Sequence, residues 1–196
     1  MKDACSKQDD IELQLTHDEI GVLGANKLKQ MGYIATFSNI TGAAISEKPD
    51  ALGINSGGES FLLEVKVSRS DFLADRKKRH RNTEYAIGNY RAYLTPKGLL
   101  SPEEIPYGWQ LWEVHGKTKP VIKVIKGPKY KRVPNGAFTF KETTYLHCTQ
   151  EELEHFYDKA HDRGLVSMLA TLLSRAGDEG IDIQRLATRN GKGFKR

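Results

Sequence analysis

The sequence predicts an α/β or α+β domain with a central mixed β-sheet flanked by helices. Segments with helical periodicity alternate with short runs of β-favouring residues, and a glycine-rich connection joins two of those runs as a hairpin. The chain has 196 residues, of which 38% are hydrophobic, and this is enough apolar material for one core. Elements in this order pack as helices on the faces of one sheet.

The domain is predicted to span residues 16–176, between an N-terminal segment of residues 1–15 and a basic tail of residues 177–196. No apolar run approaches the roughly 20 residues of a membrane helix, and the N-terminus is too polar for a signal peptide. Cys5 and Cys148 cannot form a disulfide framework and lack the paired spacing of a zinc site. We therefore expect a protein of the reducing cytoplasm, without membrane contact.

The first helix is predicted to begin after Thr16, because Thr16 and Glu19 have the spacing of a capping box. An apolar stripe at near-helical period continues the helix to about Gly32. Gly21 and Gly24 lie inside this stripe, and glycine weakens a helix interior. The helix prediction therefore depends on the cap and the stripe together.

A short strand is predicted at residues 33–37, and a hairpin follows with strands at residues 51–54 and 60–67. The connection Asn55-Ser56-Gly57-Gly58 permits the positive backbone angles that a tight reversal needs. The hairpin places residues from both strands next to each other on one sheet.

A second helix is predicted after the hairpin, capped by Ser68 or Ser70, with Phe72 and Leu73 facing the core. Pro96-Lys97-Gly98 ends the strand that comes next. The remaining elements are predicted as strands at residues 89–95, 109–114 and 121–125 and a helix over residues 149–174, in which Gly164 is a candidate break.

Charged residues interrupt the hairpin strands. Asp50 follows a proline where the first strand begins, and Glu64 and Lys66 lie near the end of the second. Because side chains alternate along a strand, Glu64 and Lys66 share a face with Leu62. Burying such groups is costly unless they are paired or bind a metal. The alternatives are that Asp50 starts a turn, and that Glu64 and Lys66 form a solvated, ion-paired face.

The hairpin can bring Asp50 beside Glu64, since Gly57 in the reversal lies midway between them. Two carboxylates held close repel each other, and a hard divalent cation relieves that repulsion. Lys66 can then orient a water molecule or offset charge on a phosphoryl group. These are the parts that hydrolysis of a phosphodiester needs. The sequence shows no phosphate-binding loop motif and no recognisable Ser or Cys nucleophile motif.

Pro49-Asp50 followed by Glu64-Val65-Lys66 across a hairpin resembles the PD-(D/E)XK nuclease superfamily. The segment of residues 64–77, EVKVSRSDFLADRK, is similar to the bacterial DNA-repair nuclease family linked to mitomycin resistance, and to segments of phage proteins. The resemblance covers roughly residues 16–95. It implies a restriction-endonuclease-like core within residues 16–176.

The resemblance also implies roles for individual residues. Asp50 and Glu64 would hold Mg²⁺ or Mn²⁺ together with the backbone carbonyl of Val65, and Lys66 would be the catalytic lysine. Members of the superfamily often add a glutamate from the first helix, for which Glu19 is the best-placed residue here. The capping box accounts equally well for Glu19.

Basic residues follow the predicted site and suggest contacts with nucleic-acid phosphates. The alternatives are an exposed helix end and a solvated lysine-rich hairpin. The first group, which follows Lys66, comprises Arg69, Arg76, Lys77, Lys78, Arg79 and Arg81. The second comprises Lys123, Lys126, Lys129, Lys131 and Arg132, with Tyr130 available for stacking on a base.

Together these features predict a Mg²⁺- or Mn²⁺-dependent DNA endonuclease that acts in DNA repair or in a phage or prophage setting. DNA is the expected partner, and a homodimer is compatible with the sequence. The alternatives are a non-catalytic nucleic-acid-binding module that keeps the fold, and a protein-interaction module. The six histidines, including His17, show no metal-binding grouping and are expected to be surface or core residues.

Overall fold

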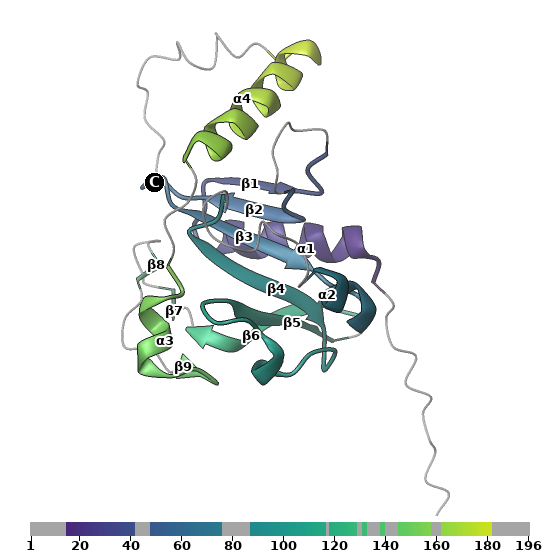
Figure 1. Ribbon diagram of the computed structural model, residues 1–196. Helices are drawn as coiled ribbons and strands as arrows, with labels where there is room; N and C mark the ends of the chain where they lie inside the picture. Colours follow the sequence, from purple (N-terminus) through teal and green to yellow (C-terminus); the bar gives the residue numbers. More distant parts are fainter. Residues whose placement is uncertain are drawn as a thin grey trace, which may run out of the picture.

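The computed structural model describes residues 15–41, 48–75, 87–116, 118–128, 131–132, 138–139, 145–157 and 162–181. Within these residues, seven strands form one sheet in the order β1-β2-β3-β4-β5-β6-β9 (Figure 1). The strands of this sheet are β1 (Ala35–Ser38), β2 (Ala51–Ile54), β3 (Ser60–Val65), β4 (Tyr90–Pro96), β5 (Gln110–His115), β6 (Val121–Pro128) and β9 (Tyr145–Leu146). A separate two-stranded ladder joins β7 (Lys131–Arg132) to β8 (Phe138–Thr139).

The sheet is mixed, because β3, β4 and β5 run parallel and every other neighbouring pair is antiparallel. The remaining described elements are α1 (His17–Gln30), α2 (Arg69–Asp75), the 3₁₀ turn η2 (Pro102–Glu104), α3 (Gln150–Glu154) and α4 (Asp162–Asp178). The prediction of an α/β or α+β domain with a central mixed sheet is therefore confirmed.

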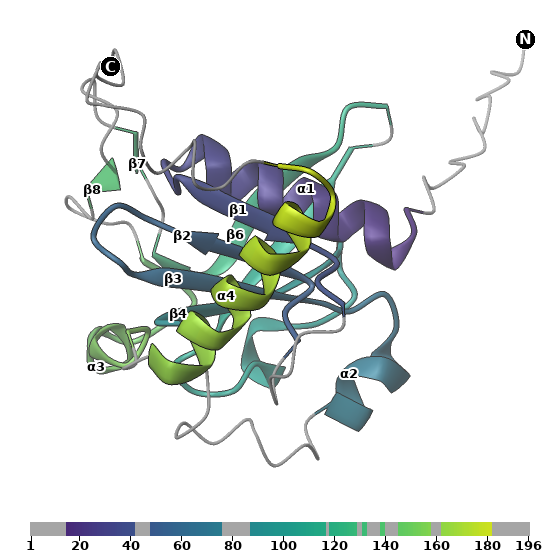
Figure 2. The same cartoon turned by 90° about the horizontal axis from the view of Figure 1, so that it is seen from above.

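The helices cover the two faces of the sheet with two separate apolar clusters. Ile20 and Leu28 of α1 pack with Leu63 and Trp112 on one face. On the other face, Phe72 of α2 and Met168 of α4 pack with further side chains of the sheet, among them Leu52, Leu62 and Tyr93. Figure 2 shows α1 and α4 on opposite sides of the sheet. Residues that alternate along a strand therefore face different helices.

The start of α1 is as predicted. Thr16 Oγ1 accepts a hydrogen bond from the Glu19 N–H at 3.3 Å, and Glu19 Oε2 accepts one from the Thr16 N–H at 2.8 Å, which completes the capping box. The two glycines of this helix serve its packing. A Cβ on Gly24 would lie 2.8 Å from Leu63 and 3.0 Å from Leu94, so glycine lets α1 lie close against the sheet.

The hairpin turns through Asn55, whose side chain organises the reversal. Asn55 Oδ1 accepts hydrogen bonds from the N–H groups of Gly57 and Glu59, both at 2.9 Å, and its Nδ2 donates to Glu59 Oε2 at 2.8 Å. Gly58 has a φ of 84°, which glycine adopts without strain. The turn thus fixes the pairing of β2 with β3, in which Leu52 lies opposite Leu62.

Two details of the helices differ from the sequence-based expectations. Leu73, which was expected to face the core, is 48% exposed. The buried residues of α2 are Phe72 and Asp75, which share a helix face because they are three residues apart. The helix expected over residues 149–174 is described as α3 and α4, and Gly164 lies inside α4, so the suggested break at this glycine is wrong.

In the described part of the chain, no helix combines the length and the apolar character needed to cross a bilayer.

Gly24→Val tests the close approach of α1 to the sheet. A branched side chain there would overpack against Leu63 and Leu94, so we expect the free energy of unfolding to fall by about 1–3 kcal/mol in urea denaturation. Gly177→Val in α4 is the matched control, because nothing lies within 4 Å of a Cβ there. If both variants lose the same free energy of unfolding, the stability does not depend on close packing at Gly24.

Candidate functional site

The hairpin brings Asp50 and Glu64 to the same face of the sheet. Ala51 pairs with Leu63, and Asp50 and Glu64 are the next positions along the two strands. Leu52 and Leu62, two residues away on each strand, lie in the apolar cluster on the side of α2 and α4. Because alternate residues share a face, both carboxylates lie on that side, at the carboxyl end of β3.

Glu64 and Lys66 are buried, with 7% and 4% of their surfaces exposed. They therefore do not form the solvated, ion-paired face that the sequence left open. Lys66 Nζ donates a hydrogen bond to Glu64 Oε2 at 3.3 Å, and it also lies 3.6 Å from Oδ1 of Asp75. The main chain holds the lysine as well, since its N–H donates to the Leu94 carbonyl of β4 at 3.1 Å.

Asp50 is the most accessible acid of this group, and its contacts fix its position. Its Oδ2 accepts a hydrogen bond from the Val65 N–H at 2.8 Å and lies 3.3 Å from Nε2 of His17. Burial and the nearby Glu64 carboxylate raise the pKa of Asp50 to about 6, although Val65, His17 and Lys66 oppose the shift. Burial is the larger cause of this shift, and the Glu64 carboxylate adds to it.

Helix α1 contributes His17 to the site. Glu19, the residue suggested from this helix, is exposed, and its carboxylate is hydrogen-bonded to Thr16 in the capping box, which lowers the pKa of Glu19. Gly21 lets the helix approach Asp50, because a Cβ there would lie 3.1 Å from the Asp50 carbonyl oxygen. The histidine could have been expected from its place in the first turn of the same helix.

Asp75 is the second residue of the site that sequence reasoning missed. It ends α2 and is 1% exposed, and its Oδ2 accepts a hydrogen bond from the Tyr93 hydroxyl at 3.1 Å. The available signal was its spacing of three from Phe72, which places both side chains on one face of a helix.

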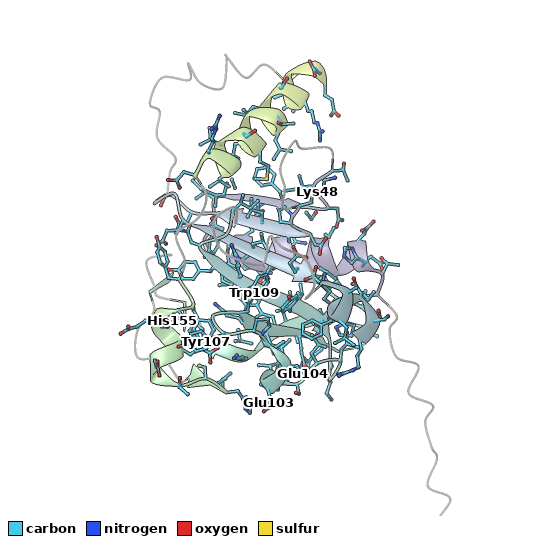
Figure 3. All side chains as sticks on the ribbon, in the orientation of Figure 1. Lys48, Glu103, Glu104, Tyr107, Trp109 and His155 are labelled. Carbon is cyan, nitrogen blue, oxygen red and sulfur yellow. The ribbon has the colours of Figure 1, made fainter. Side chains whose placement is uncertain are left out.

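The basic residues suggested for phosphate contact are only partly described. Arg69 is paired with Glu104, with 3.0 Å between Nη1 and Oε2, so its guanidinium is engaged within the chain (Figure 3 labels Glu104). This arginine holds the pKa of Glu104 down at about 2. In the second group, Lys123 is exposed on β6, but Lys126 is buried and lies 2.8 Å from Glu152, so it is not available to a phosphate. Lys131 and Arg132 form β7, but their side chains are not described. The others, Arg76, Lys77, Lys78, Arg79, Arg81 and Lys129, lie outside the described residues.

The donor set at the carboxyl end of β3 fits a hard divalent cation. Across the residues that the structure describes, no three His, Cys, Asp or Glu side chains are grouped to hold a metal ion. Mg²⁺, however, is commonly bound by one or two carboxylates and completes its shell with water and substrate phosphate. Asp50, Glu64 and the Val65 carbonyl suit that requirement. Burial and, after it, the Glu64 carboxylate raise the pKa of Asp50, and a bound cation would offset both effects.

No model of a known protein family matches the chain, and no curated protein matches it. Among solved structures, the chain is similar to the SPO1766 protein of unknown function from Silicibacter pomeroyi, with 15% sequence identity and a TM-score of 0.46. The similarity covers 94% of this chain and 100% of that chain. It bears on neither the site nor an activity.

Asp50→Asn tests the raised pKa of Asp50, which burial and the nearby Glu64 carboxylate cause. The folded chain keeps the Asp50 proton up to about pH 6, whereas the unfolded chain releases it near the usual pKa of 3.8. The folded state therefore binds more protons in this window, and stability falls as pH rises from about 4 to about 6. Without metal, the variant should gain about 2–3 kcal/mol over the wild type between pH 4 and pH 7.

The measurement is denaturant unfolding of both proteins in a chelating buffer across that pH range. Asparagine keeps an oxygen that can accept the Val65 N–H bond, so the comparison isolates the charge. A stability difference that stays constant with pH would contradict the raised pKa.

Glu19→Ala separates the capping role of Glu19 from a metal-binding role. Loss of the capping box should lower the thermal unfolding midpoint, because the Thr16 N–H loses its acceptor. The affinity for Mn²⁺, measured by isothermal titration calorimetry, should stay at the wild-type value. A loss of affinity comparable to that of Glu64→Ala would restore Glu19 to the ligand set.

Proposed function

We propose that the protein is a Mg²⁺- or Mn²⁺-dependent DNA endonuclease of the PD-(D/E)XK type, acting in DNA repair or in a phage or prophage setting. The observation that carries this proposal is the convergence of Asp50, Glu64 and Lys66 on one face of the sheet, at the end of β3. Carboxyl ends of neighbouring parallel strands are common places for ligand sites in α/β proteins. The sequence resemblance of residues 16–95 supports the same proposal.

The residues of the site divide the work between them. Asp50 and Glu64 would hold the cation with the Val65 carbonyl, and the cation would polarise the phosphodiester and favour ionisation of the attacking water. The Val65 N–H and His17 fix the orientation of the Asp50 carboxylate. Lys66 supplies a positive charge whose ammonium can donate to the attacking water or offset charge that develops on the phosphoryl oxygens.

Cleavage of DNA by the purified chain is the direct test. Supercoiled plasmid and single-stranded, duplex and branched oligonucleotides are incubated with Mg²⁺, Mn²⁺ or chelator. We expect metal-dependent cleavage that falls about 100-fold or more in Asp50→Ala, Glu64→Ala and Lys66→Ala. Affinity for Mn²⁺ should be lost in the two acid variants and kept in Lys66→Ala, because the lysine is not a ligand.

Glu151→Ala, purified in the same way, is the control for the loss of an exposed acid, since Glu151 lies on α3. Cleavage that persists in Lys66→Ala would count against the assignment of the lysine. Metal-independent DNA binding without cleavage would instead identify a nucleic-acid-binding module. A protein that neither binds nor cleaves DNA would favour the alternative of a protein-interaction module.

A further inference from the structure

The ammonium of Lys66 lies between two carboxylates that belong to different elements. Glu64 is on β3, two residues before the lysine, which directly follows that strand, and Asp75 is at the end of α2. Lys66 Nζ is 3.3 Å from Glu64 Oε2 and 3.6 Å from Asp75 Oδ1. All three side chains are at least nine-tenths buried, so charge pairing is the main compensation for removing the ammonium from water.

Asp75 is itself held in place by a buried tyrosine. The Tyr93 hydroxyl donates a hydrogen bond to Asp75 Oδ2 at 3.1 Å, which leaves Oδ1 directed toward Lys66. The Tyr93 ring packs edge-on against Phe72 and is stacked on Trp109, with centroid distances of 5.1 Å and 4.7 Å (Figure 3 labels Trp109). Rings confined on both sides fix the hydroxyl, and through it the carboxylate.

We propose that Asp75 is the positioning residue of Lys66, and that Tyr93 orients Asp75 for this task. The inference rests on the proposed function, in which the Glu64 carboxylate contacts both the cation and Lys66. A cation that binds Glu64 draws its negative charge away from the ammonium and weakens that pair. Asp75 keeps the ammonium in position while Glu64 serves the metal.

The donor count of the ammonium agrees with this arrangement. An ammonium group has three N–H donors. One is used by Glu64, and a second faces Asp75 at ion-pair distance. The third is directed by the other two, and it is the one that can reach the attacking water or a phosphoryl oxygen. Without Asp75 the ammonium would keep only the Glu64 contact, and its third N–H would no longer be directed at the reacting groups.

Asp75→Asn is the principal test, because it keeps the size of the side chain and removes the charge. We expect kcat to fall at least tenfold, while KM for DNA and the Mg²⁺ concentration at half-maximal rate change by less than twofold. Tyr93→Phe should lower kcat by a smaller factor and should have no further effect in the Asp75→Asn background. Asp71→Asn makes the same chemical change on α2 and should leave kcat unchanged.

A second measurement does not depend on activity. The free energies of unfolding of Lys66→Met, Asp75→Asn and the double variant form a double-mutant cycle. We expect the loss in the double variant to differ from the sum of the two single losses, because either single change leaves one member of the Lys66–Asp75 pair buried without the other. If Asp75→Asn fails to fold, Tyr93→Phe in the Lys66→Met cycle takes its place.

The outcomes separate the two proposals. A wild type that cleaves no DNA overturns the proposed function, while the cycle still decides whether Asp75 holds Lys66. In an active protein, the positioning role is overturned if Asp75→Asn keeps its kcat, or if it raises the Mg²⁺ requirement as a metal ligand would. Additive losses in the cycle, without coupling, also overturn it.

Discussion

A buried ammonium group must be surrounded by opposite charge, and the end of β3 is organised around this requirement. Lys66 directly follows β3, and its ammonium lies near Glu64 on that strand and Asp75 on the helix that comes next. Asp75 depends on Tyr93, and Tyr93 depends on the aromatic packing of α2 against the sheet. A single charge at the strand end thus connects a strand, a helix and one of the two apolar clusters. Its removal would leave two buried acids facing each other.

The acids are brought together by sheet geometry and by a close helix. Pairing of β2 with β3 places Asp50 and Glu64 at neighbouring positions on one face. Helix α1 covers the opposite face, but its first turn extends far enough for His17 to contact Asp50. Gly21 permits this approach, since a Cβ there would lie 2.7 Å from Asn39 Oδ1 and 3.1 Å from the Asp50 carbonyl oxygen. A residue that weakens the helix locally therefore completes the site.

Most of the fold followed from local signals in the sequence. The capping box at Thr16, the glycine-rich reversal and the strand alternation of Glu64 and Lys66 each depend on neighbouring residues, and each was predicted. Contacts between distant segments were harder to predict. Asp75 and Tyr93 are 18 residues apart and meet only after α2 packs on the sheet. Leu73 was assigned to the core because apolarity alone does not fix the rotation of a seven-residue helix.

The β2–β3 hairpin keeps its reversal and its two acids at opposite ends. Asn55 braces the reversal through its own side chain, which accepts hydrogen bonds from the N–H groups of Gly57 at the tip and Glu59 beyond it. Ser56 is exposed at the same tip, on the side remote from the two acids. A fluorescent label attached at Ser56 would therefore leave both the braced reversal and the acids undisturbed.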